Sequence, residues 1–331
     1  MKIQKNISLA DKNWFKTGGA AAYYSTPQTS AEFTESILYA VSNQLPVFVL
    51  GEGANILISD DGYPGVVIHP KLKKIAIDNL DTRNIVTAEA GVTLQDLIDY
   101  LTANNYESII YPTHQNRITS ASNDLGNGLV EFSGIPGTIG GSVYINVHYF
   151  QYFLSNFLLS AELIAKENGK IFSVDENWFK FDYDDSRLQE KQHYLLRASF
   201  QLKKINDLES AYQRGRRDEI IRHRQQRYPT SNTCGSFFRN FKLEEIPFEI
   251  HGKKILNVAY YLDQLGIKGE LSFGKARVSP QHANMLITSD GAISADIINL
   301  AQEMKKRLWD RFHLTPHLEC QLIGFGDAPP I

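Results

Sequence analysis

The sequence predicts an α+β protein with more than one domain. Its first part has the order helix, strand, glycine-rich turn and strand, and the rest alternates short strands with helices and turns. A chain of 331 residues exceeds the length at which a single hydrophobic core usually stops growing. We therefore expect two or three domains of mixed secondary structure.

The first predicted helix and the two strands that follow it surround a glycine-rich turn at residues 51–57. Before it, residues 30–41 begin with a capping-box-like sequence and carry apolar residues at helical spacing. The apolar runs 46–50 and 66–68 predict buried strands on either side of the turn. Because the turn begins where a strand ends, it lies where open α/β sheets usually hold ligands. It lacks the third glycine of the G-x-G-x-x-G fingerprint, and it is not a Walker loop.

The later elements follow from the same periodicities. About residues 75–205 are predicted to form strands with one helix, and the residues after them are predicted to form helices separated by turns. The expected strands are 85–90, 159–164 and 195–202, and the expected helical or amphipathic stretches are 94–101, 211–226, 258–265 and 293–309. Tyr228-Pro229 marks a boundary after the helix at 211–226, because the residue before a proline disfavours helical backbone.

Composition and charge exclude several classes of protein. The chain is 43% hydrophobic and 21% charged, which is ordinary for a globular protein, and its net charge of -3 gives no footprint for nucleic acid. The basic run 214–224 has two interpretations, a solvated helix face or a site for an anionic ligand. No run of 18 apolar residues occurs, and the first six residues have no signal-peptide core. We expect a soluble cytoplasmic protein that spans no membrane.

Cysteine and histidine give no sign of a metal centre. Only Cys234 and Cys320 occur, without C-x-x-C spacing, so neither a disulfide scaffold nor a zinc site is expected. A reducing cytoplasm suits this cysteine content. His114 and His148 are expected to be surface or turn residues, which is the commoner state of an isolated histidine.

The most informative stretch is a run of glycines around a proline. It comprises Gly134, Ile135, Pro136, Gly137, Thr138, Ile139, Gly140 and Gly141. Glycine permits positive φ and close approach to a ligand, and successive backbone N–H groups form a concavity that binds anions. A tight turn without a ligand is the alternative interpretation. The run predicts a flat or phosphorylated ligand against the backbone.

Eight motifs occur in one order along nearly the whole chain, and together they resemble the UDP-N-acetylenolpyruvoylglucosamine reductase (MurB) family. They are residues 13–19, 50–57, 90–92, 129–141 with Asn146, 235–240, 262–269, 276–284 and 318–324. The short link from Leu202 to Ala211 is similar to the compact, type II-like branch of that family.

The resemblance implies an FAD-binding fold of the vanillyl-alcohol oxidase/MurB type with two α+β subdomains, followed by a C-terminal α+β substrate-binding domain. The expected boundaries are 1–72, 73–209 and 210–331. The two glycine turns would flank the FAD pyrophosphate, because backbone N–H groups donate without side-chain bulk. The implied FAD-binding residues are Gly51, Glu52, Gly53, Ala54, Asn55 and Ile56 in the first turn and Gly134, Ile135, Pro136, Gly137, Thr138, Gly140 and Gly141 in the second.

The implied reaction is a relay in which NADPH reduces FAD and the enolpyruvyl group of UDP-N-acetylglucosamine enolpyruvate is then reduced. Its product is UDP-N-acetylmuramate, a peptidoglycan precursor. Ser236 is the implied proton donor, and Glu319 assists at the carboxylate end of the substrate. A serine hydroxyl is a weak acid, so this role requires a strongly basic intermediate within hydrogen-bond reach. The implied substrate-binding residues are Tyr183, Arg239, Asn240, Lys268 and His282. The family precedent implies a monomer.

Position 184 departs from the family pattern. The family has Tyr-Arg-x-Ser there, with the arginine placed to stabilise the enolate form of the substrate, whereas this chain has Asp184 after Tyr183. At an effective dielectric of about 20, a charge reversal roughly 4 Å from an enolate changes the interaction by roughly 8 kcal/mol. Ala54 also replaces a pyrophosphate-binding serine, and residues 147–151 put bulk into a turn that is open in the family.

Three functions are compatible with these motifs. In the first, the chain is a working reductase of this family, and Arg187 or Arg117 supplies the missing cation. In the second, it is a flavoenzyme of the same fold that acts on a different substrate. In the third, it binds FAD or a nucleotide sugar without catalysis and serves as a binding or regulatory protein. The first is favoured because four residues stand in motif positions, namely Ser236, Glu319, Asn240 and Lys268.

Overall fold

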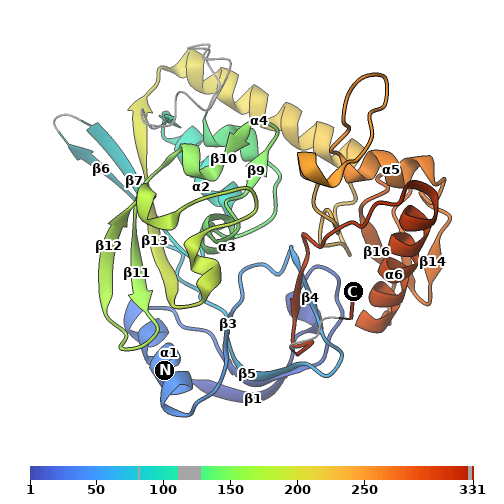
Figure 1. Cartoon of the computed structure of the whole chain (residues 1–331). Helices are drawn as coiled ribbons and strands as arrows, with labels where there is room; N and C mark the ends of the chain where they lie inside the picture. Colours follow the sequence, from blue (N-terminus) through green and yellow to red (C-terminus); the bar gives the residue numbers. More distant parts are fainter. Residues whose placement is uncertain (81–82, 111–127, 327–329) are drawn as a thin grey trace. The chain divides into compact units, whose positions relative to one another are not determined.

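The computed structural model describes residues 1–80, 83–110, 128–326 and 330–331, and these residues form the expected mixture of helices and strands (Figure 1). The chain divides into two compact units. The first unit comprises residues 1–4, 24–52 and 65–224, and the second comprises residues 5–23, 53–64 and 225–331. Each unit therefore combines segments that are far apart in the sequence.

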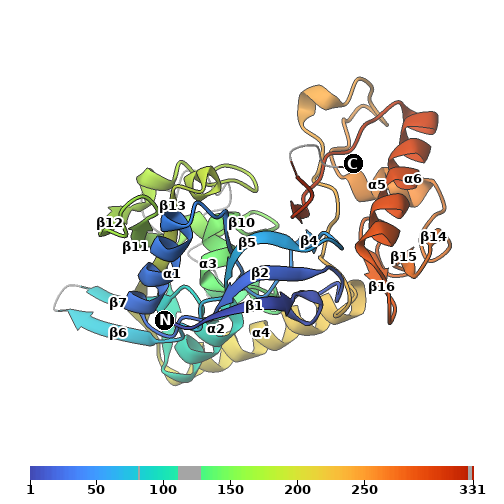
Figure 2. The same cartoon turned by 90° about the horizontal axis from the view of Figure 1, so that it is seen from below.

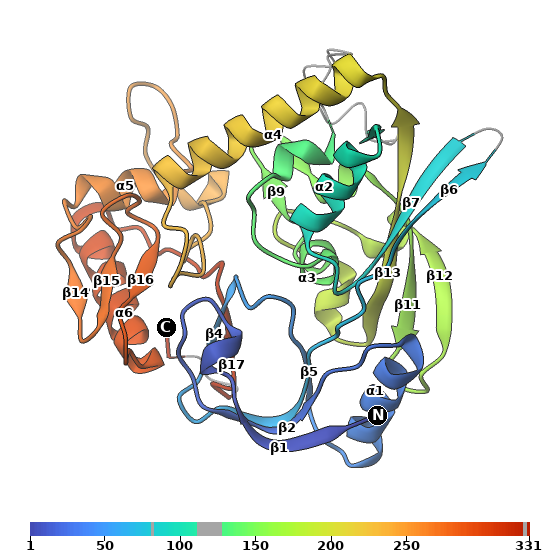
Figure 3. The same ribbon diagram turned by 180° about the vertical axis from the view of Figure 1, so that it is seen from behind.

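An antiparallel six-stranded sheet is the framework of the first unit (Figure 3). Its strands lie in the order β12 (Ile171–Asp175), β11 (Leu158–Ala165), β13 (His193–Lys204), β7 (Arg83–Glu89) and β6 (Ile75–Leu80), and β8 (Tyr106–Ser108) also pairs with β13. Alternate residues of the central strand β13 are buried, because successive side chains of a strand point to opposite faces. From residue 196 on, the buried residues are Leu196, Ala198, Phe200 and Leu202, and Tyr194 and Leu195 before them are buried as well. This alternation confirms the strand predicted at 195–202.

Two helices share a core with that face of the sheet. α2 (Leu94–Ala103) buries Leu94, Leu97, Ile98 and Leu101 at helical spacing, and the Thr93 side chain caps it by accepting from Asp96 N at 3.0 Å. α3 (Ile139–Tyr144) is shorter and adds Ile139 and Val143 to the same cluster. The helix predicted at 94–101 is confirmed, whereas α3 begins inside the glycine run that was expected to be a turn.

The predicted order of helix, strand, glycine-rich turn and strand is confirmed, except that a further strand begins at Ile56, inside the turn expected at 51–57. α1 (Ser30–Ser42) precedes β3 (Val47–Val49), and the turn leads to β4 (Ile56–Ile58) and then β5 (Tyr63–Ile68). β3 and β5 run parallel, with Val47 opposite Val66. They belong to a four-stranded sheet in the order β1 (Ile3–Ser8), β2 (Ala20–Ser25), β5 and β3 (Figure 2).

The second unit is built around α6 (Ser294–Phe312). This helix packs against β14 (Ser272–Phe273) and β15 (Ala276–Val278) of a three-stranded antiparallel sheet completed by β16 (Leu286–Thr288), and against α5 (Val258–Gln264). β17 (Gln321–Ile323) runs parallel to β4, with Leu322 opposite Leu57. Ser294 Oγ lies 2.6 Å from the carbonyl oxygen of Ile58 and 2.8 Å from Thr17 Oγ1. The C-terminal part of the chain thus folds onto segments from its first 64 residues.

The long helix α4 (Asp207–Arg227) carries the basic run and begins four residues before its predicted start. Its arginines are engaged within the first unit. Arg216 makes a bidentate pair with the buried Glu131, Arg217 bonds Asp99, and Arg222 pairs with Glu219. These pairs favour the interpretation of the run as a helix face over that of a site for an anionic ligand.

We predict that Arg216→Ala lowers the free energy of unfolding by about 2–3 kcal/mol, because the nearly buried Glu131 carboxylate would lose its partner. Urea unfolding followed by circular dichroism measures this. The matched control is Arg222→Ala on the same helix, whose pair with Glu219 is exposed on both sides and should contribute less than about 0.5 kcal/mol. Equal losses in the two variants would contradict the assignment of Glu131 as a buried ionic anchor.

Among the described residues, no helix combines the length and apolar content needed to cross a membrane. The same residues contain no group of three or more histidine, cysteine or acidic side chains arranged to hold a metal ion.

Candidate functional site

The first glycine turn presents a run of unbonded backbone donors. Leu50 N bonds to Ile68 O at 2.8 Å at the end of β3, but the N–H groups of the next five residues, Gly51 to Asn55, have no hydrogen-bond partner among the described residues. Buried or half-buried backbone donors are rarely left unpaired. Five consecutive donors of this kind fit an anionic ligand such as a phosphate.

The second half of this turn rests on the N-terminal motif. Gly53 has φ +67°, and a Cβ atom at this position would lie 2.7 Å from Asn13 Cα. Asn13 is itself fixed, because its side-chain amide donates to the carbonyls of Leu9 and Thr17 at 2.8 Å each. Trp14 N in turn donates to Gly53 O at 3.0 Å. The turn therefore requires glycine at this position, and the motif at 13–19 holds its conformation.

The glycine run at 134–141 differs from its predicted role as a concavity of successive free N–H groups. Most of its N–H groups are bonded within the protein: Ile139 N donates to Val92 O at 2.8 Å, Gly140 N to Ala90 O at 2.9 Å, and Gly141 N to Thr138 Oγ1 at 3.2 Å. α3 begins at Ile139, and the first N–H groups of a helix have no partner within it, so here the carbonyls of Val92 and Ala90 and the N-cap Thr138 satisfy them. Within the described chain, Thr138 is the member of the run whose N–H has no partner.

The two turns meet in the first unit. Gly137 N donates to Glu52 Oε2 at 2.7 Å, and a Cβ atom at Gly51 would lie 2.8 Å from Thr138 Oγ1. Glycine at 51 is thus required for a close approach of the turns rather than for its own backbone conformation. Their contact supports the expectation that both turns flank one ligand group.

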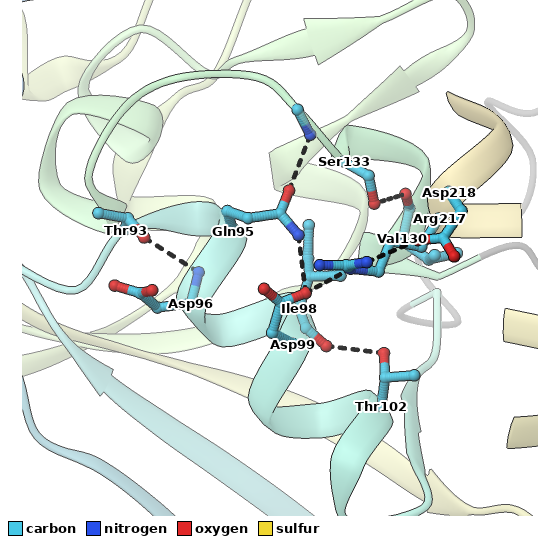
Figure 4. A network of polar contacts seen from close by, with 11 residues as sticks. Thr93, Gln95, Asp96, Ile98, Asp99, Thr102, Val130, Ser133, Arg217 and Asp218 are labelled. Atoms are coloured by element: carbon cyan, nitrogen blue, oxygen red, sulfur yellow. Dashed lines mark hydrogen bonds and ion pairs between the residues drawn. The ribbon is translucent and has the colours of Figure 1, made fainter. Parts of the chain in front are cut away.

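A polar network fixes the start of the second turn (Figure 4). Gln95 of α2 accepts from Gly134 N at 2.8 Å through Oε1 and donates to Asp99 Oδ1 at 2.8 Å through Nε2. Asp99 in turn bonds Arg217 of α4. Sequence reasoning missed Gln95, because its partner lies 39 residues away and nothing local marks the contact.

Ser236 and Glu319 lie on adjacent extended segments of the second unit. Glu319 N donates to Phe237 O at 3.0 Å, and Ser236 forms a bridge with Met285. The buried Asn284 fixes the serine segment on its other side. Its carbonyl accepts from Phe237 N at 2.8 Å, and its side chain exchanges two hydrogen bonds with the backbone of Phe238. Sequence reasoning included Asn284 in a motif without giving it this role.

The first turn also reaches the segment that carries Glu319. Gln321 N donates to Asn55 O at 3.1 Å, and Asn55 Nδ2 lies 3.5 Å from Glu319 O. Within the second unit, residues predicted to bind the cofactor and residues predicted to perform catalysis are therefore hydrogen-bonded neighbours.

The predicted cationic substrate ligands of the second unit already face carboxylates. Arg239 makes a bidentate pair with Glu245 at 2.9 and 2.6 Å, which lowers the pKa of Glu245 to about 2. Lys268 Nζ lies 3.0 Å from Asp263 Oδ1. Asn240 Oδ1 accepts from Val258 N at 3.3 Å and so caps the start of α5.

His282 is the most perturbed histidine of the predicted site. Burial, together with the nearby Arg227 and Lys268, lowers its pKa to about 4. Its Nδ1 lies 3.3 Å from Asn284 N and accepts from it, and Tyr228 packs edge-on at 5.5 Å between ring centroids. His282 is therefore neutral at pH 7 and contributes no charge to substrate binding.

Asp184 and Tyr183 lie in the first unit, on a tight turn closed by reciprocal backbone hydrogen bonds between Asp182 and Asp185. Asp184 Oδ1 lies 3.2 Å from His148 Nδ1, and His148, which was expected to be a surface or turn residue, lies on a short strand with 22% of its side chain exposed. Arg187, one of the two proposed replacement cations, stacks on Trp178 at 4.7 Å from the ring centroid. Arg117 and His114 lie outside the described residues.

Comparison with known proteins defines first a class and then a family. A model described as an FAD binding domain matches residues 21–129, which contain the first glycine turn. A model of the C-terminal domain of UDP-N-acetylenolpyruvoylglucosamine reductase matches residues 226–323, which contain Ser236 and Glu319. The chain is thus a flavoprotein with an FAD-binding domain.

Relatives along the whole chain specify the family. UDP-N-acetylenolpyruvoylglucosamine reductase of Parasynechococcus marenigrum (strain WH8102) is 30% identical over 337 residues, covering 99% of this chain and 98% of that protein. The corresponding protein of Chloroherpeton thalassium (strain ATCC 35110 / GB-78) is 30% identical and covers 98% of this chain and 94% of its own length. A crystal structure of the Thermus caldophilus reductase has the same fold, with a TM-score of 0.72 at 22% identity over 98% of this chain and 99% of that one. The chain belongs to the UDP-N-acetylenolpyruvoylglucosamine reductase family.

Proposed function

We propose that this chain is an FAD-dependent, NADPH-using reductase that converts UDP-N-acetylglucosamine enolpyruvate to UDP-N-acetylmuramate. Family membership over the full length supports the reaction class. The observation that carries the proposal further is the hydrogen-bonded group of Asn55, Glu319 and the Ser236 segment in the second unit.

The first glycine turn fits the pyrophosphate of FAD. It offers five consecutive N–H donors, and Gly51 and Gly53 allow the turn to pack closely against Thr138 and Asn13. The second turn contributes mainly by shape, because most of its N–H groups are bonded within the protein. Bound FAD would accept two electrons from NADPH and supply them to the enolpyruvyl double bond.

Ser236 is proposed to deliver a proton to one carbon of the enolpyruvyl double bond, next to the carbon that receives the hydride. Its segment is held between Met285 and the segment of Glu319, so the backbone position from which the hydroxyl extends is fixed. Positioning of this kind compensates for a weak acid, because it removes the entropic cost of bringing the donor to the reacting atom. Glu319, on the neighbouring segment, is proposed to orient the carboxylate end of the substrate.

Lys268 and Arg239 are proposed to contact the phosphate or carboxylate groups of the substrate from the second unit, together with Asn240. Because both cations are paired with carboxylates, binding an anion requires that each shares or exchanges its partner. Tyr183 is proposed to contact the substrate from the first unit. We further expect the protein to be a monomer of the cytoplasm, and light scattering after gel filtration tests its mass in solution.

Substrate-dependent oxidation of NADPH tests the proposal directly. The purified protein should carry a flavin spectrum, and it should oxidise NADPH rapidly only when UDP-N-acetylglucosamine enolpyruvate is added, with UDP-N-acetylmuramate as product. UDP-N-acetylglucosamine, which lacks the enolpyruvyl group, is the matched control ligand and should give no turnover. If the protein carries flavin but shows no substrate-dependent turnover at any pH, it is instead a divergent paralogue. The acidic side chain at position 184 is the sequence feature that suggests this alternative.

A further inference from the structure

His148 and Asp184 form a pair that the established family assignment does not explain. His148 Nδ1 and Asp184 Oδ1 lie 3.2 Å apart, and both side chains are about four-fifths buried, with 22% and 19% of their surface exposed. The histidine lies on β9 (His148–Tyr149), which pairs with β10 (Tyr152–Phe153). The aspartate lies on the turn at 182–185. Two segments of the first unit, 36 positions apart, thus meet at one polar contact between an imidazole nitrogen and a carboxylate oxygen.

Aromatic side chains hold the imidazole from two sides. Phe153 stacks on it with a centroid distance of 5.3 Å and an interplanar angle of 29°, and Tyr183 lies 4.6 Å away and tilted. With Nδ1 directed to Asp184, the other ring nitrogen, Nε2, points away from the carboxylate. Among the described residues, the polar contact of the His148 ring is the one between Nδ1 and Asp184. The pair therefore presents one oriented nitrogen that is available to a ligand.

Backbone conformation and hydrogen bonds fix the segments on both sides of the contact between His148 and Asp184. Asp184 has φ +53°, a left-handed conformation that costs an aspartate free energy and persists only where its surroundings fix it. Gln189 Nε2 donates to Asp184 O at 2.8 Å. The buried Asn146 ties the two segments together, because its Nδ2 donates to Asp182 O at 3.0 Å while its Oδ1 accepts from Ser155 N at 3.0 Å.

Charge explains why the two residues need each other. Asp184 Oδ2 is buried and has no hydrogen-bond partner among the described residues. A buried carboxylate without a polar partner is strongly disfavoured, and the imidazole Nδ1 beside it offers one. A carboxylate oxygen accepts hydrogen bonds, so it orients the ring with the N–H at Nδ1 toward it. Asp184, which alone would repel an anionic substrate, thereby orients the ring of His148.

The position of the pair in the first unit suits a substrate next to the cofactor turns. The N-cap of α3, Thr138, packs closely against Gly51, and the helix ends at Tyr144, whose carbonyl accepts from Ser186 Oγ at 2.7 Å just beyond Asp184. A helix of six residues is about 9 Å long. The pair is therefore attached to the far end of a short helix whose near end forms part of the predicted pyrophosphate site.

We propose that His148, oriented by Asp184 through Nδ1, donates from Nε2 in its doubly protonated form to the anionic carboxylate or enolate oxygen of the substrate, since a neutral ring with its hydrogen on Nδ1 can only accept at Nε2. This inference depends on the proposed reductase function. His148 is then a catalytic residue, and Asp184 is a positioning residue that acts through it. The alternative cation within the described chain is less suitable, since Arg187 stacks on Trp178 and lies 3.6 Å from Glu190. Arg239 and Lys268 of the second unit already face carboxylates.

Substitution with chemical rescue tests the inference. His148→Ala should lower kcat for substrate-dependent NADPH oxidation by about a hundredfold, the usual scale for a positioned proton-bearing group. Added imidazole should raise kcat of this variant at least tenfold, because it can occupy the space left between Phe153 and Tyr183. Asp184→Asn should lower kcat by about tenfold, and the double variant should be no slower than His148→Ala. The matched control is His193→Gln, a histidine of the same unit packed edge-on against Phe172 and Trp178.

Two further measurements separate the possible failures. Flavin content and the rate of flavin reduction by NADPH should be unchanged in every variant, so their loss would assign the pair a merely structural role and overturn the inference. An unchanged kcat in His148→Ala with normal flavin content would overturn it equally. If the unmodified protein shows no turnover, the proposed function fails, and the inference is then judged by substrate titration followed by protein fluorescence. His148→Ala should still weaken that binding by at least tenfold, and equal binding would contradict the inference.

Discussion

Replacing Ser236 with alanine is expected to lower substrate-dependent turnover by about a thousandfold or more while leaving the reduction of bound flavin by NADPH unchanged. A positioned general acid usually contributes a factor of 10²–10⁴, and the upper part of this range applies where no other donor can reach the same carbon. Stopped-flow absorbance of the flavin measures the two half-reactions separately. The selective loss follows from the proposed role, since the serine acts only after the flavin has been reduced.

The control for this substitution is Ser231→Ala. Ser231 is exposed and lies five positions earlier on the same segment, outside the backbone bridge to Met285. It should leave both half-reactions unchanged. Loss of both half-reactions in Ser236→Ala would show that the substitution disturbs the fold or the flavin site, and the proton-donor role would then be wrong.

Gly53→Ala is expected to give a protein that keeps less than about a tenth of its flavin through purification. The residue has φ +67°, and an added Cβ would lie 2.7 Å from both Asn13 Cα and Lys12 O, so the backbone of the first turn must move. Left-handed backbone alone costs an alanine roughly 1–2 kcal/mol, and the clash with a fixed backbone adds to this cost. Moving the turn would disperse the five N–H donors. The ratio of flavin to protein absorbance after gel filtration measures the result.

Gly252→Ala provides a matched control for the backbone conformation. Gly252 has φ +73°, nearly the same as Gly53, but an added Cβ would meet nothing within 4 Å. This variant should lose a similar amount of stability from strain and retain its flavin. Normal flavin content in Gly53→Ala would contradict the assignment of the first turn as the pyrophosphate site, whatever its effect on stability.

Local periodicity predicted most of the helices and strands. α2 and β13 are confirmed because their apolar residues recur at spacings of one helical turn and of two residues, and this information lies within each segment. The division of the chain into units depends on other information. β4 pairs with β17 across more than 260 positions, and Ser294 bonds Thr17 and Ile58, contacts that no local pattern marks.

The candidate site was predictable to a similar extent. The motifs located both glycine turns, Ser236 and Glu319, and the structure brings members of each group into hydrogen-bonded contact. They did not indicate that the N–H groups of the second turn are taken by Val92, Ala90 and Gln95, since these partners come from other elements. The sequence-based hypothesis likewise placed the missing cation at Arg187 or Arg117, although His148, which lies 3.2 Å from Asp184, stands in the altered stretch after Asn146.

The central claim is that bound flavin links NADPH to the enolpyruvyl group of a UDP-sugar, and an anaerobic titration of the unmodified protein tests it most directly. The flavin is reduced with one equivalent of NADPH in the absence of oxygen, and UDP-N-acetylglucosamine enolpyruvate is then added. Our account predicts rapid return of the oxidised flavin spectrum with formation of one equivalent of UDP-N-acetylmuramate. A flavin that stays reduced after addition of the substrate would contradict it.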